Sequence, residues 1–104
     1  MTEAKVKSLV RKQLEKDGYM VWYPAISRFA PKFPYSKESA KDIFTLFDCL
    51  AWQDSEIRFI QYTTFKNRRA REKKIKDFYE KNKCFLPAEV WSIREDNSID
   101  IIYI

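Results

Sequence analysis

The 104-residue sequence contains no histidine, a single glycine and two cysteines. The absence of histidine excludes a histidine general base, a histidine-ligated zinc ion and any nucleophile that is activated by histidine. Cys49 and Cys84 each adjoin apolar residues, so we expect buried, reduced thiols rather than a disulfide, a nucleophile or a metal ligand. Carboxylates, lysines and a hard metal ion are the catalytic groups that remain. One glycine among many lysines and glutamates is typical of thermophilic proteins.

Long apolar runs are also missing. None approaches the roughly 18 residues that a membrane-spanning helix requires, and the charged segment 1–5 is typical of the start of a helix rather than of a signal peptide. We therefore expect a cytoplasmic protein that does not associate with membranes.

The residues that are present favour a folded, basic domain. Hydrophobic residues make up 45% and aromatic residues 16% of the chain, which is enough to build a core and excludes wholesale disorder. The length predicts a single domain over residues 1–104. Twenty Lys and Arg against fifteen Asp and Glu give a net charge of +5. This balance favours a nucleic acid or another polyanion as the partner.

The pattern along the chain predicts an α/β fold, in which helices flank a central mixed sheet. Thr2 is a plausible N-cap for a helix with apolar residues at helical spacing, and Gly18 is expected to end that helix in a left-handed conformation. A second helix is predicted over 67–81, with Asn67 as its cap and Ile75, Phe78 and Tyr79 as its apolar stripe. A long ordered loop is predicted over 24–41. The predicted strands are 19–23, 47–52, 57–65, 89–93 and 100–103.

The segment with most chemical information runs from Asp48 through a predicted hairpin to Thr63. Residues two apart on a strand share a face, so Gln61 and Thr63 lie on the same side of the strand and can converge with Asp48 across the hairpin. In a catalytic version of this geometry, two carboxylates hold Mg²⁺ beside a phosphate and a lysine stabilises the developing charge. The simpler interpretation is a polar residue at a strand end, facing a hydrogen-bonded Gln–Thr pair.

This arrangement resembles the PD-(D/E)XK nuclease superfamily, with a restriction-endonuclease-like fold, and most closely its small archaeal Holliday-junction resolvases. The resemblance covers nearly the whole chain. The opening helix, with Glu3 near its start and Gly18 after its end, is similar to the family's first helix, whose acid reaches the active site. Asp48 stands where the family has its first strand acid, Gln61 where it has a second acid, and Thr63 where it has lysine.

The resemblance implies a Mg²⁺- or Mn²⁺-dependent DNA endonuclease that acts on structured or branched DNA. The implied metal ligands are Asp48, Gln61 and the backbone carbonyl of Tyr62, with Glu3 as a direct or outer ligand. Gln61 carries one negative charge fewer than an acid, and Thr63 lacks the positive charge of lysine, so Thr63 or Lys66 would have to take the lysine's place. Catalysis and binding without catalysis therefore both stay open.

Two segments are rich in positive charge. Seven cations crowd the start of the second predicted helix, where the helix dipole disfavours them, and this placement favours phosphate contact over an ordinary solvated face. This run consists of Lys66, Arg68, Arg69, Arg71, Lys73, Lys74 and Lys76. The predicted loop mixes cations with aromatic residues, a composition that suits nucleic-acid backbones and unpaired bases. The expected nucleic-acid contacts are Arg28, Lys32, Lys37, Lys66, Arg68, Arg69, Arg71 and Lys73.

Two further expectations concern partners. The resemblance implies a homodimer, for which apolar residues near the C-terminal end would supply the interface; these are Trp91, Ile101, Ile102 and Ile104. Trp22 and Trp52, like Trp91, lie in predicted strands and are expected in the core or at an interface. The third functional hypothesis is a protein-interaction module whose basic surface binds an acidic partner.

Overall fold

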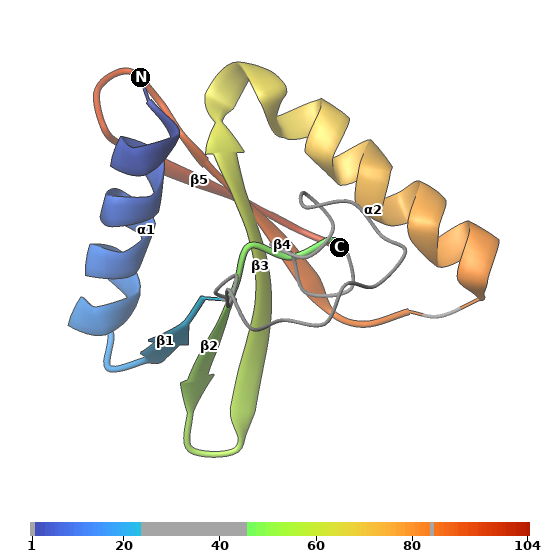
Figure 1. Ribbon diagram of the computed structural model, residues 1–104, viewed down its shortest axis with the longest axis horizontal. Coiled ribbons are helices and arrows are strands. Elements are labelled where there is room, and N and C mark those ends of the chain that lie inside the picture. Colours follow the sequence, from blue (N-terminus) through green and yellow to red (C-terminus); the bar gives the residue numbers. More distant parts are fainter. Residues whose placement is uncertain (1, 24–45, 84) are drawn as a thin grey trace, which may run out of the picture.

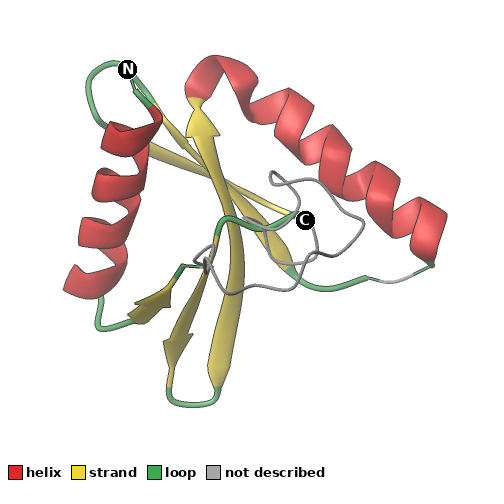
Figure 2. Cartoon of the chain, in the orientation of Figure 1, coloured by secondary structure: helices red, strands yellow, loops and turns green. Residues whose placement is uncertain are grey.

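The computed structural model describes residues 2–23, 46–83 and 85–104. These residues form an α/β domain in which a five-stranded mixed sheet lies between two α-helices (Figures 1 and 2). The elements, in chain order, are α1 (Glu3–Lys16), β1 (Met20–Trp22), β2 (Cys49–Gln53), β3 (Glu56–Thr64), the 3₁₀ turn η2 (Phe65–Asn67), α2 (Arg68–Asn82), β4 (Ala88–Ile93) and β5 (Ile99–Tyr103). The predicted α/β class and element order are confirmed.

The strands are ordered β1-β2-β3-β4-β5 across the sheet. Neighbouring strands are antiparallel except β3 and β4, which are parallel because α2 connects them. The carboxyl ends of β3 and β4 therefore lie together, and η2 and the start of α2 follow directly from that edge of the sheet (Figure 1). The N-terminal ends of α1 and α2 therefore lie in one region, next to the carboxyl ends of β3 and β4.

Helix α1 covers one face of the sheet. The Thr2 hydroxyl accepts a hydrogen bond from the Lys5 amide at 3.2 Å, as expected of an N-cap. After the helix, Gly18 has a φ of +90°, a conformation that a side chain would strain. The buried residues of this layer are Val6, Val10 and Leu14 of α1 with Cys49, Ala51, Ile60, Trp91 and Ile93 of the sheet.

Helix α2 covers the opposite face. Ile75 and Tyr79 are buried against the sheet and Phe78 packs beside them, which confirms the predicted stripe. Asn67 occupies the N-cap position but its side chain caps nothing; its amide nitrogen donates instead to the Thr64 hydroxyl at 3.1 Å. The cores on the two faces alternate along β4, since Ala88 and Val90 face α2 whereas Trp91 and Ile93 face α1. All the residues of β4 are buried, as expected of a strand covered on both faces.

The structure corrects the expectation that Trp91 supplies a dimer interface, and it leaves Trp22 and Trp52 only the interface half of their expectation. Trp91 is not an exposed interface residue: it is 1% exposed beneath α1, and its indole nitrogen donates to Glu89 at 3.0 Å. Trp22 and Trp52 do not enter the core but are 56% and 50% exposed. They lie on the α2 face of β1 and β2 at the end of the sheet where the β2–β3 hairpin turns, beside exposed Met20 and Ile57. Residues 24–45, including the predicted loop over 24–41, lie outside the described ranges.

Candidate functional site

Asp48 is held at the point where β2 begins. Its amide donates to the Ile60 carbonyl at 2.9 Å, and its carboxylate oxygen Oδ2 accepts a hydrogen bond from the Tyr62 amide at 2.9 Å. The backbone N–H and C=O of one strand residue point toward the same neighbouring strand. The Tyr62 carbonyl therefore points to the side of β3 on which Asp48 lies. The Asp48 carboxylate therefore meets the backbone of β3 at Tyr62. Its convergence with the side chains of Gln61 and Thr63 stays a prediction.

Gln61 lies on the predicted face of β3, but it is not the half-exposed, hydrogen-bonded residue of the simpler interpretation. It lies opposite Val90 on the α2 face and is 0% exposed. Neither its amide oxygen nor its amide nitrogen has a hydrogen-bond partner in the structure that is described. A buried amide without partners costs free energy, on the order of 1–3 kcal/mol for each unsatisfied group. Gln61 and Thr63 are thus not a hydrogen-bonded pair on a half-exposed strand, since both are buried.

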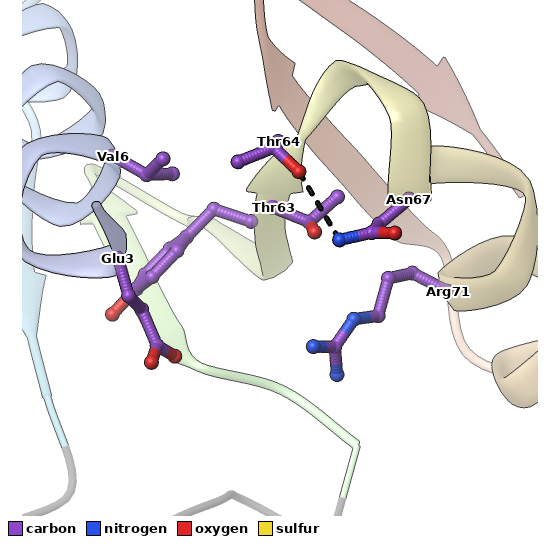
Figure 3. Close-up of a pocket in the computed structure, with 7 residues that line it drawn as sticks. Glu3, Val6, Thr63, Thr64, Asn67 and Arg71 are labelled. Carbon is purple, nitrogen blue, oxygen red and sulfur yellow. Dashed lines mark hydrogen bonds between the residues drawn. The ribbon is translucent and has the colours of Figure 1, made fainter. Parts of the chain in front are cut away.

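A cavity of about 170 Å³ opens beside this part of β3. It lies between the first turn of α1 and the first turns of α2, and Figure 3 shows the Glu3 carboxylate and the Arg71 guanidinium entering it from opposite sides. Glu3 and Arg71 make no ion pair with any described residue. The residues that line the cavity are Glu3, Val6, Tyr62, Thr63, Thr64, Asn67 and Arg71.

The electrostatics of the cavity favour a neutral Tyr62 phenol. Burial raises the pKa of Tyr62 well above its ordinary value, and the carboxylates of Asp48 and Glu3 raise it further. The ring of Tyr23 stands edge-on to that of Tyr62, with centroids 6.4 Å apart, and burial raises the pKa of Tyr23 as well. Tyr62 is therefore a hydrogen-bond donor at neutral pH and neither a base nor a nucleophile.

Lys66 and Arg71 differ in their relation to Thr63. Lys66 follows the end of β3 in η2 and lines a neighbouring cavity, whereas Arg71 lines the same cavity as Thr63. The charge pattern of the sequence predicts Arg71 only as a nucleic-acid contact, and Asn67 is predicted only as a helix cap. The signal that identifies Arg71 is its position one helical turn after the predicted cap, which returns it to the same side of α2.

The predicted basic surface is divided into paired and unpaired cations. Arg69 and Lys76 both pair with Glu72, at 2.9 and 3.1 Å, and lower its pKa, while Lys73 pairs with Asp77 at 3.2 Å. Four cations of the predicted run make no ion pair with described residues; these are Lys66, Arg68, Arg71 and Lys74. The predicted contacts Arg28, Lys32 and Lys37 lie outside the described ranges.

The cysteine prediction is confirmed for Cys49. Its thiol is free and buried, and burial with the nearby Asp48 and Glu89 carboxylates raises its pKa to about 12. Such a thiol stays protonated at neutral pH and is therefore not a nucleophile. Cys84 lies outside the described ranges.

Two observations limit the metal chemistry. Within the described ranges, no three side chains of the Asp, Glu, His and Cys types approach closely enough to hold a metal ion. The oxygens near β3 belong instead to one carboxylate, one orphaned amide and one backbone carbonyl, with Glu3 across the cavity.

Neither described helix is long and apolar enough to cross a membrane.

No family model matches the chain, and comparisons with curated proteins and with solved structures find no similar protein.

Proposed function

We propose that this protein binds nucleic acid through a restriction-endonuclease-like domain and hydrolyses phosphodiester bonds in structured or branched DNA with Mg²⁺ or Mn²⁺. The observation that carries the proposal is the contact between Asp48 and Tyr62 beside a cavity that Glu3 and Arg71 enter from opposite sides. The order of helices and strands, with a parallel β3–β4 pair joined by α2, also supports it. An intracellular location belongs to the same proposal.

The donors near β3 suit a hard divalent cation. Mg²⁺ is bound by oxygen, often through one or two carboxylates completed by water and substrate phosphate. Asp48, the unpartnered amide oxygen of Gln61 and the Tyr62 carbonyl would hold the ion, with Glu3 as an outer ligand. When bound, such an ion supplies Lewis-acid stabilisation of the phosphate and lowers the pKa of its water.

Arg71 is the residue that we assign to the role of the missing lysine. Its guanidinium lines the cavity with Thr63 and makes no ion pair with described residues, so it is available to a phosphate oxygen. A guanidinium binds two phosphate oxygens at once and keeps its charge at all working pH values. Thr63, Asn67 and the neutral Tyr62 phenol add uncharged hydrogen-bonding groups around the same space.

The second candidate is a nucleic-acid-binding protein that has lost catalysis. It is favoured by the small number of carboxylates, since Asp48 is the only acid within hydrogen-bonding distance of Tyr62 among described residues and Gln61 adds no charge. A homodimer is part of either proposal. With Trp91 buried, the interface would fall to Ile101, Ile102 and Ile104 on or beside β5, an edge strand of the described sheet.

The test is a cleavage and binding assay on four-way junction, flap, single-stranded and duplex DNA, with Mg²⁺ and with Mn²⁺. We expect cleavage that Asp48→Asn abolishes and that Arg71→Gln lowers by about a hundredfold or more. Arg11→Gln is the charge-matched control, because Arg11 pairs with Glu15 on α1 and is not among the predicted nucleic-acid contacts.

Three outcomes separate the candidates. Cleavage that is lost in Asp48→Asn while binding persists supports the nuclease. Wild-type binding without cleavage in either metal supports the inactive binder. Absence of both activities would overturn the proposal and leave the basic surface to an acidic protein partner.

A further inference from the structure

A second cation cluster lies on the other side of Thr64 from the candidate site. The last residue pair of the parallel strands is Thr64 opposite Ile93, so the next residues, Phe65 and Arg94, lie at the same edge of the sheet. Phe65 and Arg94 both line a cavity of about 380 Å³. Its lining residues are Thr64, Phe65, Lys66, Ile93, Arg94 and Glu95.

Two arginines stack on the Phe65 ring, and one of them, Arg94, lines this cavity. The guanidinium carbon of Arg68 lies 3.6 Å from the centroid of the Phe65 ring, and that of Arg94 lies 4.0 Å from it. Arg68 also donates from Nη1 to the Phe65 carbonyl at 2.8 Å. We call Arg68 and Arg94, stacked on Phe65, the arginine pair.

The backbone around the arginine pair is fixed by the fold. Arg94 sits in the β4–β5 turn, where its amide donates to the Ser98 carbonyl and its carbonyl accepts from the Asn97 amide, each at 2.9 Å. Arg68 begins α2 directly after η2. The two cations therefore come from separate parts of the chain and meet at Phe65 because the sheet brings those parts together.

The charges of the arginine pair are only partly balanced. Arg94 approaches Asp100 at 3.8 Å, which is long for an ion pair, and both side chains are partly exposed. Neither Arg68 nor Lys66 forms an ion pair with a described residue, and Glu95 is the acid that lines the cavity. Bringing guanidinium groups together costs electrostatic energy, which a bound anion would offset. A stacked guanidinium keeps its N–H edge available for such an anion.

We propose that the arginine pair, with Lys66, binds a backbone phosphate of the nucleic acid, next to the phosphate that occupies the candidate site. This inference rests on the proposed function and extends it. Thr64 lines both cavities, so a strand that enters the Glu3–Arg71 cavity passes directly onto the arginine pair. Arg94 thereby becomes a nucleic-acid contact that the charge pattern of the sequence does not identify.

The experiment measures the affinity for four-way junction and duplex DNA over a series of salt concentrations, for the wild type and single variants. A lost phosphate contact lowers the slope of log affinity against log salt by roughly 1. We expect this change, with a loss of affinity of about tenfold, in Arg94→Gln and in Arg68→Gln. Arg11→Gln is the charge-matched control, since Arg11 pairs with Glu15 on α1 at 2.7 Å.

Phe65→Leu is the variant that separates stacking from charge. It keeps all three cations but removes the ring that orients them, so affinity should fall severalfold while the salt slope stays within error of the wild type. Thermal unfolding of every variant shows whether the domain remains folded under the assay conditions.

The outcomes distinguish this inference from the proposed function. If the wild type binds DNA and the arginine-pair variants behave like Arg11→Gln, the phosphate contact is wrong and nucleic-acid binding stands. If the wild type shows no salt-dependent binding to any nucleic acid, both proposals are overturned. The contact is supported if Arg94→Gln and Arg68→Gln bind more weakly and with a reduced salt slope while Arg11→Gln binds like the wild type.

Discussion

Replacing Gln61 with methionine is expected to stabilise the folded protein. Gln61 is 0% exposed and both polar atoms of its amide lack partners in the described structure. Methionine has a similar length and flexibility, but it has no hydrogen-bonding group of comparable strength to leave unsatisfied. The substitution therefore removes a desolvation cost without creating a cavity.

The magnitude follows from the cost of an unsatisfied buried group, which is about 1–3 kcal/mol. We expect the free energy of unfolding to rise by about 2 kcal/mol, because the relief is partly offset by imperfect packing of the thioether. For a domain of this size, that change raises the midpoint of thermal unfolding by roughly 10 °C. Metal-dependent cleavage should fall at the same time, since the variant loses the amide oxygen.

The assay is urea-induced unfolding, monitored by tryptophan fluorescence. The slope of the unfolding free energy against urea concentration is compared between the variant and the wild type. Gln61→Glu is the opposing variant, because a buried carboxylate without a partner is destabilising at pH 7. Added Mg²⁺ should recover part of the stability of Gln61→Glu and have little effect on Gln61→Met. A Gln61→Met protein that unfolds at a lower urea concentration than the wild type, at unchanged slope, would refute the reasoning.

Three other predictions concern stability and reactivity. Gly18→Ala should destabilise the fold by about 1–2 kcal/mol in urea unfolding, because φ is +90° and the new Cβ would lie 2.6 Å from Nε2 of Gln53. Glu89→Gln should cost on the order of 3 kcal/mol in the same assay, since it leaves the nearly buried Arg58 without its carboxylate partner. In a Cys84→Ala background, Cys49 should resist alkylation at pH 8 until the protein is unfolded. Because folding raises the pKa of the Cys49 thiol from 9.0 to about 12, the thiol's contribution to stability should be complete below pH 9 and decline from pH 9 towards pH 12. Rapid alkylation of the native protein, or stability that is constant over that interval, would contradict the last prediction.

The sequence by itself determined the elements and the faces of the strands. Gly18 ends the first helix because the required left-handed conformation is encoded locally, and the predicted elements agree with the observed ones to within about two residues at each end. The alternation in residues 57–64 correctly separates Gln61 and Thr63 from Tyr62, since the period of a strand is a local property. Burial of Cys49 likewise follows from its apolar neighbours.

Only the tertiary structure decided which of those faces is covered and what meets there. Periodicity places Gln61 on a face but does not say that the face is fully buried and offers no partner to the amide. It does not separate Trp91, which α1 covers, from Trp52, which lies where no described helix covers the sheet. The same limit applies to Arg71, because the packing of α2 against the carboxyl end of β3 brings its guanidinium into the cavity with Thr63. Contacts between elements far apart in the chain depend on how the helices dock on the sheet, and local sequence patterns carry little information about that docking.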